Sequence, residues 1–248
     1  MPSHYFHQQL IVRSFDAPAI NQQSIVLFNA QHINVADFTL NTLLSPFELA
    51  VLQRRKSNKA KQEYLATRLL LKFLVKHSFT EYAEVAEHHI SSEFDEPSSK
   101  LLLHIKGSNG VLSSCLSHSN GLVGAALNYE RVDFGFDIEK ISLKRPYEKL
   151  AKHFYHRDEV TLITHTDHDA AQRFFRIWTL KEALAKATSR PIAQLLSPNV
   201  FTELEAADLA VKSTEFDDYD ISIVNKKSTD WQCFYISNID QLSSVLHF

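Results

Sequence analysis

Blocks of helix-forming and strand-forming residues alternate along this chain, and their order restricts the folds that it can adopt. Residues 46–77 are rich in helix formers and predict one long helix or two consecutive helices. Residues 92–110 predict a short strand at "LLLHI" between loops. Residues 110–140 predict a strand, a turn at Asn120–Gly121, and two strands that pair as a meander.

The second half of the chain has the same mixed character. Residues 146–164 predict a charged amphipathic helix, and residues 172–187 predict a second helix. Beyond them, alternating apolar and polar residues predict antiparallel strands in "FDDYDISIVNK" and "DWQCFYISNID". This order of helices and strands predicts an α+β fold.

Composition and charge narrow the functional classes. Hydrophobic residues make up 44% of the 248 residues and charged residues 22%, which is close to globular averages and excludes a disordered or fibrous chain. The net charge of -3 argues against a protein that wraps nucleic acid, so we expect no nucleic-acid partner. The two cysteines, Cys115 and Cys233, are too few for a disulfide framework and are typical of a reducing compartment.

Targeting and nucleotide-binding signals are not recognisable. The N-terminus lacks a charged start followed by a continuous apolar block, and the longest apolar run, "RLLLKFLV", is far shorter than the roughly 20 residues of a membrane-spanning helix. We therefore expect a soluble, cytoplasmic protein without a membrane partner. The glycines all fall between residues 107 and 135 and form neither a Walker loop nor a dinucleotide fingerprint.

Two acids interrupt the apolar stretch "FGFDIEK". In a strand, the apolar residues would face the core, while Asp137 and Glu139 would project together from the other face, roughly 7 Å apart at the backbone. Gly135 would leave room beside them. Carboxylates so placed repel one another unless a cation lies between them, and magnesium completed by phosphate and water oxygens suits this geometry. An amphipathic strand with solvated acids would show the same pattern.

A second candidate feature lies in "RIWTLKEALAKA". Apolar residues recur there at helical spacing, and Glu182 and Lys186, four residues apart, share a different face. A carboxylate and an ammonium one turn apart can act as metal ligand and phosphate-binding cation on one substrate. An exposed ion pair on a helix surface is the alternative.

Further polar features are compatible with phosphate binding. In "LSHS", an imidazole flanked by hydroxyls at Ser117 and His118 can bind a phosphate, although a lone histidine is more often structural. Six basic residues cluster in the predicted helical segment, where they form either a solvated face or a site for a phosphate-rich ligand. They are Arg54, Arg55, Lys56, Lys59, Lys61 and Arg68.

Two histidine-containing runs are weaker metal candidates. The run "THTDHD" offers His165, Asp167 and His168, but it is typical of a loop between helices. The run "EHHIS" likewise lacks a third imidazole at a zinc-like spacing. We expect neither to bind a metal.

Four motifs, taken in order, resemble one family. "LSHS", "FGFDIEK", "HFYHRDEV" and "WTLKEALAKA" are similar in order and spacing to motifs of the surfactin-synthetase-activating-type (group II) 4′-phosphopantetheinyl transferases. The resemblance is strong over residues 116–187 and loose over residues 46–72. It implies a magnesium-dependent enzyme that transfers 4′-phosphopantetheine from coenzyme A to a serine of an apo acyl or peptidyl carrier protein, releasing 3′,5′-ADP.

The resemblance also implies an architecture and a setting. The family fold is a pseudo-dimer of two similar α+β halves with coenzyme A in the cleft between them, which predicts an N-terminal half at residues 1–118 and a C-terminal half at 119–248 that carries the magnesium site. Such a chain would act as a monomer. The pathway would be lipid or secondary metabolite biosynthesis, and the carrier protein is not indicated.

Roles for the acidic and lysine residues follow from the same resemblance. Asp137, Glu139 and Glu182 would be the magnesium ligands, and Lys186 would neutralise charge on the phosphate under attack. A serine hydroxyl also needs a proton acceptor, and we expect Glu182 to take this role directly or through a metal-bound water. Glu159 would help to order the site near that serine.

The resemblance implies coenzyme A ligands as well. Ser117 and His118 would contact its phosphates, and Arg54, Lys61 and Arg68 would hold the nucleotide 3′-phosphate. The chain departs from the family at Asp95-Glu96-Pro97, where the family commonly has Gly-Lys-Pro, and at Cys115, where it often has Asn. The first departure removes a cation that would face the nucleotide.

Two other functional classes remain open. The altered Asp95-Glu96-Pro97 segment would suit a catalytically silent protein that binds coenzyme A or a carrier protein. A metal-dependent phosphoesterase could use the same acids together with the His165 loop. The three classes differ in outcome: a transferase modifies the carrier protein, a silent protein binds without turnover, and a phosphoesterase releases free phosphate.

Overall fold

The computed structural model divides the chain into two compact units. Unit 1 comprises Met1–Leu10 and Asp133–Ser228, and unit 2 comprises Ile11–Val132 and Thr229–Phe248. The structure describes residues 9–16, 20, 23–96, 100–108, 112–128, 133–165, 169–226 and 230–248. Each unit is α+β, which confirms the predicted fold class.

Unit 2 is built on a sheet of seven strands in the order β1-β10-β2-β6-β5-β4-β3. Neighbouring strands are antiparallel except that β10 is parallel to both β1 and β2. The strands are β1 (Val12–Ser14), β2 (Gln23–Asn29), β3 (Ile90–Asp95), β4 (Lys100–Ile105), β5 (Leu112–Ser119), β6 (Leu122–Asn128) and β10 (Gln232–Ile236).

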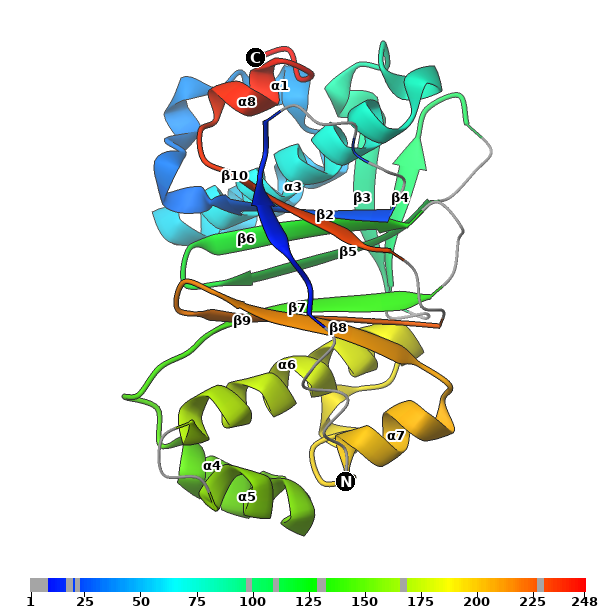
Figure 1. Cartoon of the computed structure of the whole chain (residues 1–248). Helices are drawn as coiled ribbons and strands as arrows, with labels where there is room; N and C mark the ends of the chain where they lie inside the picture. Colours follow the sequence, from blue (N-terminus) through cyan, green and yellow to red (C-terminus); the bar gives the residue numbers. More distant parts are fainter. Residues whose placement is uncertain are drawn as a thin grey trace. The chain divides into compact units, whose positions relative to one another are not determined.

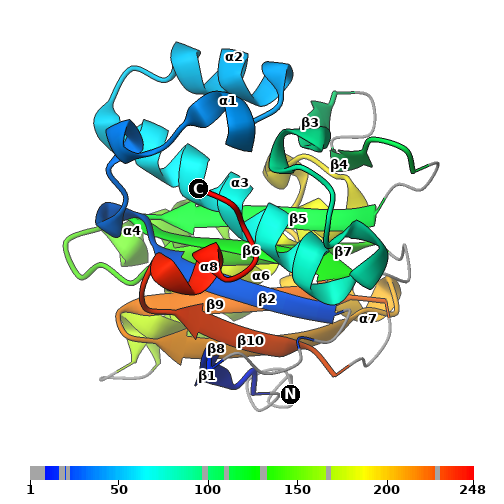
Figure 2. The same ribbon diagram turned by 90° about the horizontal axis from the view of Figure 1, so that it is seen from above.

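One long helix, α3, covers the centre of this sheet. Figure 2 shows α3 lying across β2, β5 and β6, which it contacts. The helices of unit 2 are α1 (Leu40–Leu43), α2 (Pro46–Arg54), α3 (Asn58–Ser78) and α8 (Asp240–Ser243), with short 3-10 turns between them. The segment predicted as one or two helices therefore forms two, because Ser45 and Ser57 each cap a separate N-terminus with their side chains.

Unit 1 is built on a smaller antiparallel sheet in the order β7-β9-β8. Its strands are β7 (Phe134–Lys140), β8 (Ala210–Phe216) and β9 (Tyr219–Asn225), and its helices are α4 (Tyr147–Phe154), α5 (Arg157–Thr164), α6 (Ala170–Thr188) and α7 (Val200–Ala206). Figure 1 shows α6 running along the sheet, with α4, α5 and α7 beyond it on the same side. The predicted apolar stripe of α6, which contains Ile177, Leu180 and Leu184, is completely buried.

The two units share one topology. In each, a first strand is followed by helices and then by a hairpin whose second strand pairs with the first, giving the orders β2-β6-β5 and β7-β9-β8. In unit 2 the longest helix, α3, packs on all three of these strands. In unit 1 the longest helix, α6, packs on β7 and β9. This agrees with the expected pair of similar α+β subdomains.

The unit boundary lies elsewhere than the predicted boundary between residues 118 and 119. That point falls within β5, whose residues 113–119 pair with β6, so the strands on both sides of it belong to unit 2. The last residues of the chain also return to unit 2, where β10 inserts between β1 and β2. A single boundary in the sequence therefore cannot separate the two units, because each unit is built from two stretches of the chain.

Several predicted elements differ from the observed ones. The predicted meander is wrong, because β7 pairs with β9 and lies in a different sheet from β5 and β6. The antiparallel tail holds for β8 and β9 only, since β10 is parallel to its neighbours. The single helix expected at residues 146–164 is interrupted at Tyr155 and His156, where a capping box starts α5. In the part of the chain that the structure describes, no helix is long and apolar enough to cross a membrane.

Candidate active site

Strand β7 presents its two acids to helix α6. Gly135 is the point of closest approach, because a Cβ atom there would lie 1.8 Å from the carbonyl oxygen of Ala183 and 2.7 Å from the backbone nitrogen of Ala187. Side chains alternate along a strand, so Asp137 and Glu139 face α6 as well. The room expected beside this glycine is therefore filled by the helix backbone.

A lysine of α6 binds this face of β7 directly. Lys186 Nζ donates to Asp137 Oδ1 at 2.8 Å and to the carbonyl oxygen of Phe136 at 2.9 Å. The side chain of Asp137 is 8% exposed and that of Lys186 is 31% exposed, so the pair is partly screened by water. Lys186 thus bridges the two elements instead of forming only a surface pair along the helix.

Glu182 lies within electrostatic range of the same groups. Burial raises the pKa of the Glu182 carboxyl, and the negative charges of Asp137 and Glu139 raise this pKa further, while Lys186 lowers it. Three carboxylates with this mutual influence form a hard oxygen donor set of the kind that magnesium prefers. Among the described residues, however, no group of three histidine, cysteine or acidic side chains is arranged to hold a metal ion.

Glu159 occupies a different environment. Its side chain is completely buried, and Oε1 lies 3.0 Å from Nζ of Lys181 and accepts the backbone N–H of Val200 at 2.8 Å. Its Oε2 accepts the backbone N–H of His156 at 3.1 Å, which completes the capping box of α5. The carboxylate that was expected near the incoming serine therefore does not reach solvent in this structure.

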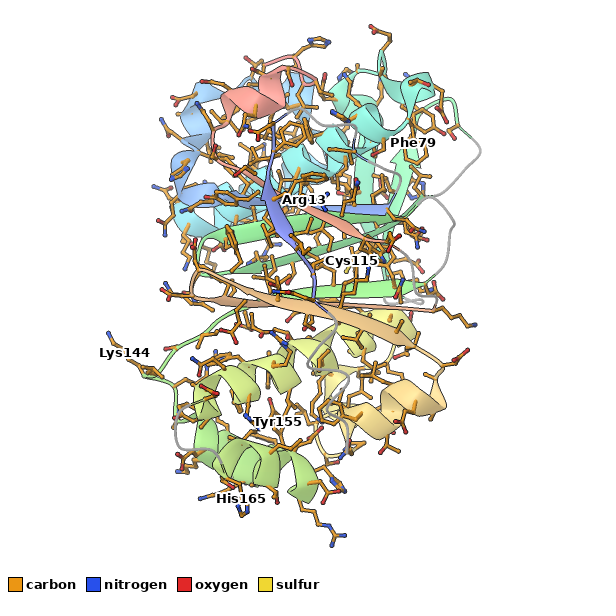
Figure 3. All side chains as sticks on the ribbon, viewed as in Figure 1. Arg13, Phe79, Cys115, Lys144, Tyr155 and His165 are labelled. Carbon is orange, nitrogen blue, oxygen red and sulfur yellow. The ribbon has the colours of Figure 1, made fainter. Side chains whose placement is uncertain are left out.

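Lys181 and Tyr155 complete this buried region. Lys181 Nζ also donates to the carbonyl oxygens of Leu195 and Pro198 and lies 5.2 Å from the centre of the Tyr155 ring. Burial lowers the pKa of Lys181 and raises that of Glu159, and each opposes the shift of the other through its charge. Figure 3 shows Tyr155 among the helices of unit 1, and Lys144 at the loop that follows β7 with its side chain pointing outward.

Ser117 and His118 lie at the end of β5 in unit 2. Ser117 is buried, whereas the side chain of His118 is 57% exposed and its Nδ1 is 3.4 Å from Oε2 of Glu63 in α3. Glu63 Oε1 accepts the backbone N–H of Gly121 at 3.0 Å in the predicted turn. Glu63 is not predictable from the sequence, because no local pattern shows that the start of α3 meets this turn.

The three basic candidates of unit 2 have unequal access to a ligand. Arg54 is exposed and donates to the carbonyl oxygen of Ala50 within its own helix. Lys61 is half-buried in the first turn of α3. Arg68 stacks on the ring of Tyr64, with its guanidinium carbon 4.1 Å from the ring centre, and its side chain is only 13% exposed. Arg68 therefore contributes to the packing of unit 2.

The structure describes only part of the Asp95-Glu96-Pro97 segment and of the two histidine-containing runs. Pro97, Asp167 and His168 lie outside the described residues. Glu87 of "EHHIS" is buried and forms an ion pair with Lys76, with 2.7 Å between Oε1 and Nζ, so it has a structural partner.

Comparison with known proteins shows similarity to 4′-phosphopantetheinyl transferases. Residues 133–236 match the model of the 4′-phosphopantetheinyl transferase superfamily. The chain is 31% identical over 157 residues to the 4′-phosphopantetheinyl transferase HetI of Nostoc sp. (strain PCC 7120), a match that covers 63% of this chain and 64% of HetI. It is 26% identical over 152 residues to slr0495 of Synechocystis sp. (strain PCC 6803), provisionally assigned the same activity, covering 61% of this chain and 59% of that protein.

These matches span less than two thirds of each relative's length. The superfamily match includes all of β7 and α6. The part of the chain that contains Asp137, Glu139, Glu182 and Lys186 is therefore similar to the 4′-phosphopantetheinyl transferase superfamily.

Proposed function

We propose that this protein transfers 4′-phosphopantetheine from coenzyme A to a serine of an apo acyl or peptidyl carrier protein, giving the holo form and 3′,5′-ADP, as a group II enzyme of this type. The observation that carries the proposal is the contact of Lys186 with Asp137, beside Glu182 whose pKa is raised by the charges of Asp137 and Glu139, within the region that matches the superfamily. Phosphoryl chemistry is catalysed mainly by positioning and charge neutralisation, which these groups can provide.

Magnesium is the proposed cofactor, with Asp137, Glu139 and Glu182 as its ligands. The three side chains supply carboxylate oxygens, the donor type that magnesium prefers, and the negative charges of Asp137 and Glu139 raise the pKa of Glu182, an effect that a cation among them would offset. When bound, the ion would neutralise charge on the pyrophosphate of coenzyme A.

Side chains of the protein would neutralise the remaining charge, accept the serine proton and bind coenzyme A. The Lys186 ammonium would neutralise charge on the attacked phosphate, and a carboxylate oxygen of Glu182 would accept the proton of the serine hydroxyl. In unit 2, we propose that Ser117, His118, Arg54 and Lys61 bind phosphates of coenzyme A. The exposure of His118 and Arg54 supports this assignment.

The cellular setting is also a proposal. We propose a cytoplasmic protein that acts as a monomer in lipid or secondary metabolite biosynthesis, without a nucleic-acid or membrane partner. The two cysteines support a reducing compartment, since both are buried and neither forms a disulfide.

A mass-shift experiment tests the proposed reaction. Purified protein is incubated with coenzyme A, magnesium and each of several apo carrier proteins, and each carrier is then weighed by mass spectrometry. We expect at least one carrier to gain the mass of a phosphopantetheine arm. Asp137→Ala and chelation of magnesium should each abolish the gain, and a fully active Asp137→Ala variant would refute the metal assignment.

One observation favours a second candidate function. The described carboxylates are not arranged as a metal site, and Lys186 is bound to Asp137. A catalytically silent protein that binds coenzyme A or a carrier protein would suit this arrangement. Binding of coenzyme A with no mass gain on any carrier would establish that candidate.

A further inference from the structure

Two glutamates, one in each unit, occupy the same place in the fold. Glu48 is the third residue of α2 and Glu159 is the third residue of α5, and each accepts the backbone N–H of its helix cap, Ser45 or His156. Their exposed fractions are 1% and 0%. Because each of these helices precedes the long helix of its unit, the two glutamates are topologically equivalent.

Each glutamate pairs with a buried lysine of that long helix. In α3, Lys72 Nζ lies 2.8 Å from Glu48 Oε2, and in α6, Lys181 Nζ lies 3.0 Å from Glu159 Oε1. We name these the α3 ion pair and the α6 ion pair. Both lysines are at most 1% exposed, and a buried charge without its partner is strongly destabilising.

Both ion pairs also bind the segment that follows the long helix. The carboxylate of the α3 ion pair accepts the backbone N–H and the hydroxyl of Ser92, at 3.0 and 2.8 Å, and its ammonium donates to the carbonyl of Ile90. The carboxylate of the α6 ion pair accepts the backbone N–H of Val200 at 2.8 Å, and its ammonium donates to the carbonyls of Leu195 and Pro198. One arrangement thus recurs in both units.

The residue after the lysine differs between the units. Lys72 is followed by Phe73, a completely buried core residue, whereas Lys181 is followed by Glu182. The arrangement therefore exists in unit 2 without a neighbouring carboxylate of the candidate site, so it does not require contact with substrate. Successive helix residues point about 100° apart, so fixing Lys181 also fixes the direction of Glu182.

From this recurrence we propose that the α6 ion pair positions α6, and with it Glu182, for the transfer reaction, and that Glu159 acts through this pair without touching substrate. The inference rests on the proposed function. In this proposal Glu159 and Lys181 support the site residue Glu182. Loss of such supporting contacts typically weakens metal binding by about 10–100-fold.

The test compares equivalent substitutions in the two units. Lys181→Met removes the ammonium of the α6 ion pair, and Lys72→Met is the matched control in the α3 ion pair. Hydrogen exchange of peptides covering residues 178–187 is measured in the full-length folded variants, together with the magnesium concentration that gives half-maximal transfer. We expect Lys181→Met to speed exchange in α6 and to raise this concentration about tenfold or more, and Lys72→Met to do neither.

A second variant covers loss of folding. Glu159→Gln/Lys181→Met removes both charges, which avoids an isolated buried charge, and it should retain more transfer than Glu159→Gln alone. Equal magnesium shifts in both lysine variants, no shift in Lys181→Met, or a double variant as inactive as Glu159→Gln would overturn the proposal. If the natural chain modifies no carrier, the proposed function fails, and the exchange of α6 peptides still decides whether the ion pair holds the helix.

Discussion

At the scale of single residues, Asp137 links structure and proposed chemistry. Its Oδ1 accepts a hydrogen bond from Lys186 at 2.8 Å, and its charge raises the pKa of Glu182. One carboxylate thus influences both the ammonium and the second acid of α6. Substitutions of Lys186 and Glu182 should affect turnover more than folding, because both side chains are only partly buried.

Lys186→Met tests the role of the ammonium. Loss of one group that neutralises developing charge typically lowers kcat by about 10²–10³-fold, and we expect a decrease in this range. The rate of phosphopantetheine transfer at saturating coenzyme A is the measurement. Lys226→Met, at an exposed position after β9, is the control and should retain the natural rate. A variant with unchanged kcat would remove Lys186 from the reaction.

Asp220 gives a prediction about pH. It is completely buried and accepts hydrogen bonds from Arg176 and Thr179 at 2.7 and 2.6 Å, and burial raises its pKa from 3.8 to about 6. Because the folded state holds this proton more tightly than the unfolded state, the contribution of Asp220 to stability is complete below about pH 4 and is lost as the pH rises through about 6.

Asp220→Asn removes this titration and keeps a carbonyl acceptor. The free energy of unfolding of the natural chain, relative to the variant, should fall between pH 4 and 6 by something on the order of 2–3 kcal/mol and then stay level. Urea denaturation at several pH values measures it. A difference that does not change with pH would show that Asp220 is ionised throughout.

At the scale of elements, α6 is held on several sides. Arg176 and Thr179 bind it to β9, Lys186 binds it to β7, and Lys181 binds it to α5 and to the segment before α7. At Gly135 the strand β7 comes close to the backbone of α6. The helix and the strand therefore act as one support for the candidate site.

Gly135→Ala tests the approach of α6 to β7. The added Cβ would overlap backbone atoms of α6, so we expect a loss of about 3 kcal/mol in the free energy of unfolding and about 10²-fold lower transfer from a misplaced site. Gly107→Ala is a useful control, because nothing lies within 4 Å of its Cβ and only its positive φ opposes the change. It should cost about 1 kcal/mol without loss of transfer.

At the scale of the molecule, the C-terminal segment belongs to the core of unit 2. Strand β10 pairs with β1 and β2, and its Ile236 is completely buried in the cluster that also contains residues of α3. The sheet of unit 2 is therefore complete only when residues 232–236 are in place between β1 and β2. Residues 12–14 and 232–236, which are far apart in the sequence, thus pair in one sheet.

Ile236→Ala should show this dependence. Removal of a buried isoleucine side chain typically costs about 2–5 kcal/mol, whereas Phe248→Ala, at a residue that is 43% exposed, should cost about 1 kcal/mol or less. Urea denaturation followed by far-UV circular dichroism measures both. Equal effects would mean that β10 is not part of the core of unit 2.

Short-range sequence patterns predicted much of the secondary structure of this protein. The helical segments, the Asn120–Gly121 turn, the α+β class and the alternation that places Asp137 and Glu139 on one face of β7 depend on neighbouring residues, whose spacing is visible in the sequence. The motifs that resemble a transferase family are local as well. These features were predicted because short-range backbone and side-chain preferences specify them.

Only the tertiary structure decided the rest. The pairing of β7 with β9, the insertion of β10, the bond from Lys186 to Asp137 and the burial of Glu159 against Lys181 join residues that are distant in sequence or depend on which side chains become buried. Burial changes the role of a charged residue, because a carboxylate enclosed with its ion-pair partner supports a helix instead of meeting solvent. The sequence by itself determined which acids this protein carries, and packing decided which of them remain accessible for chemistry.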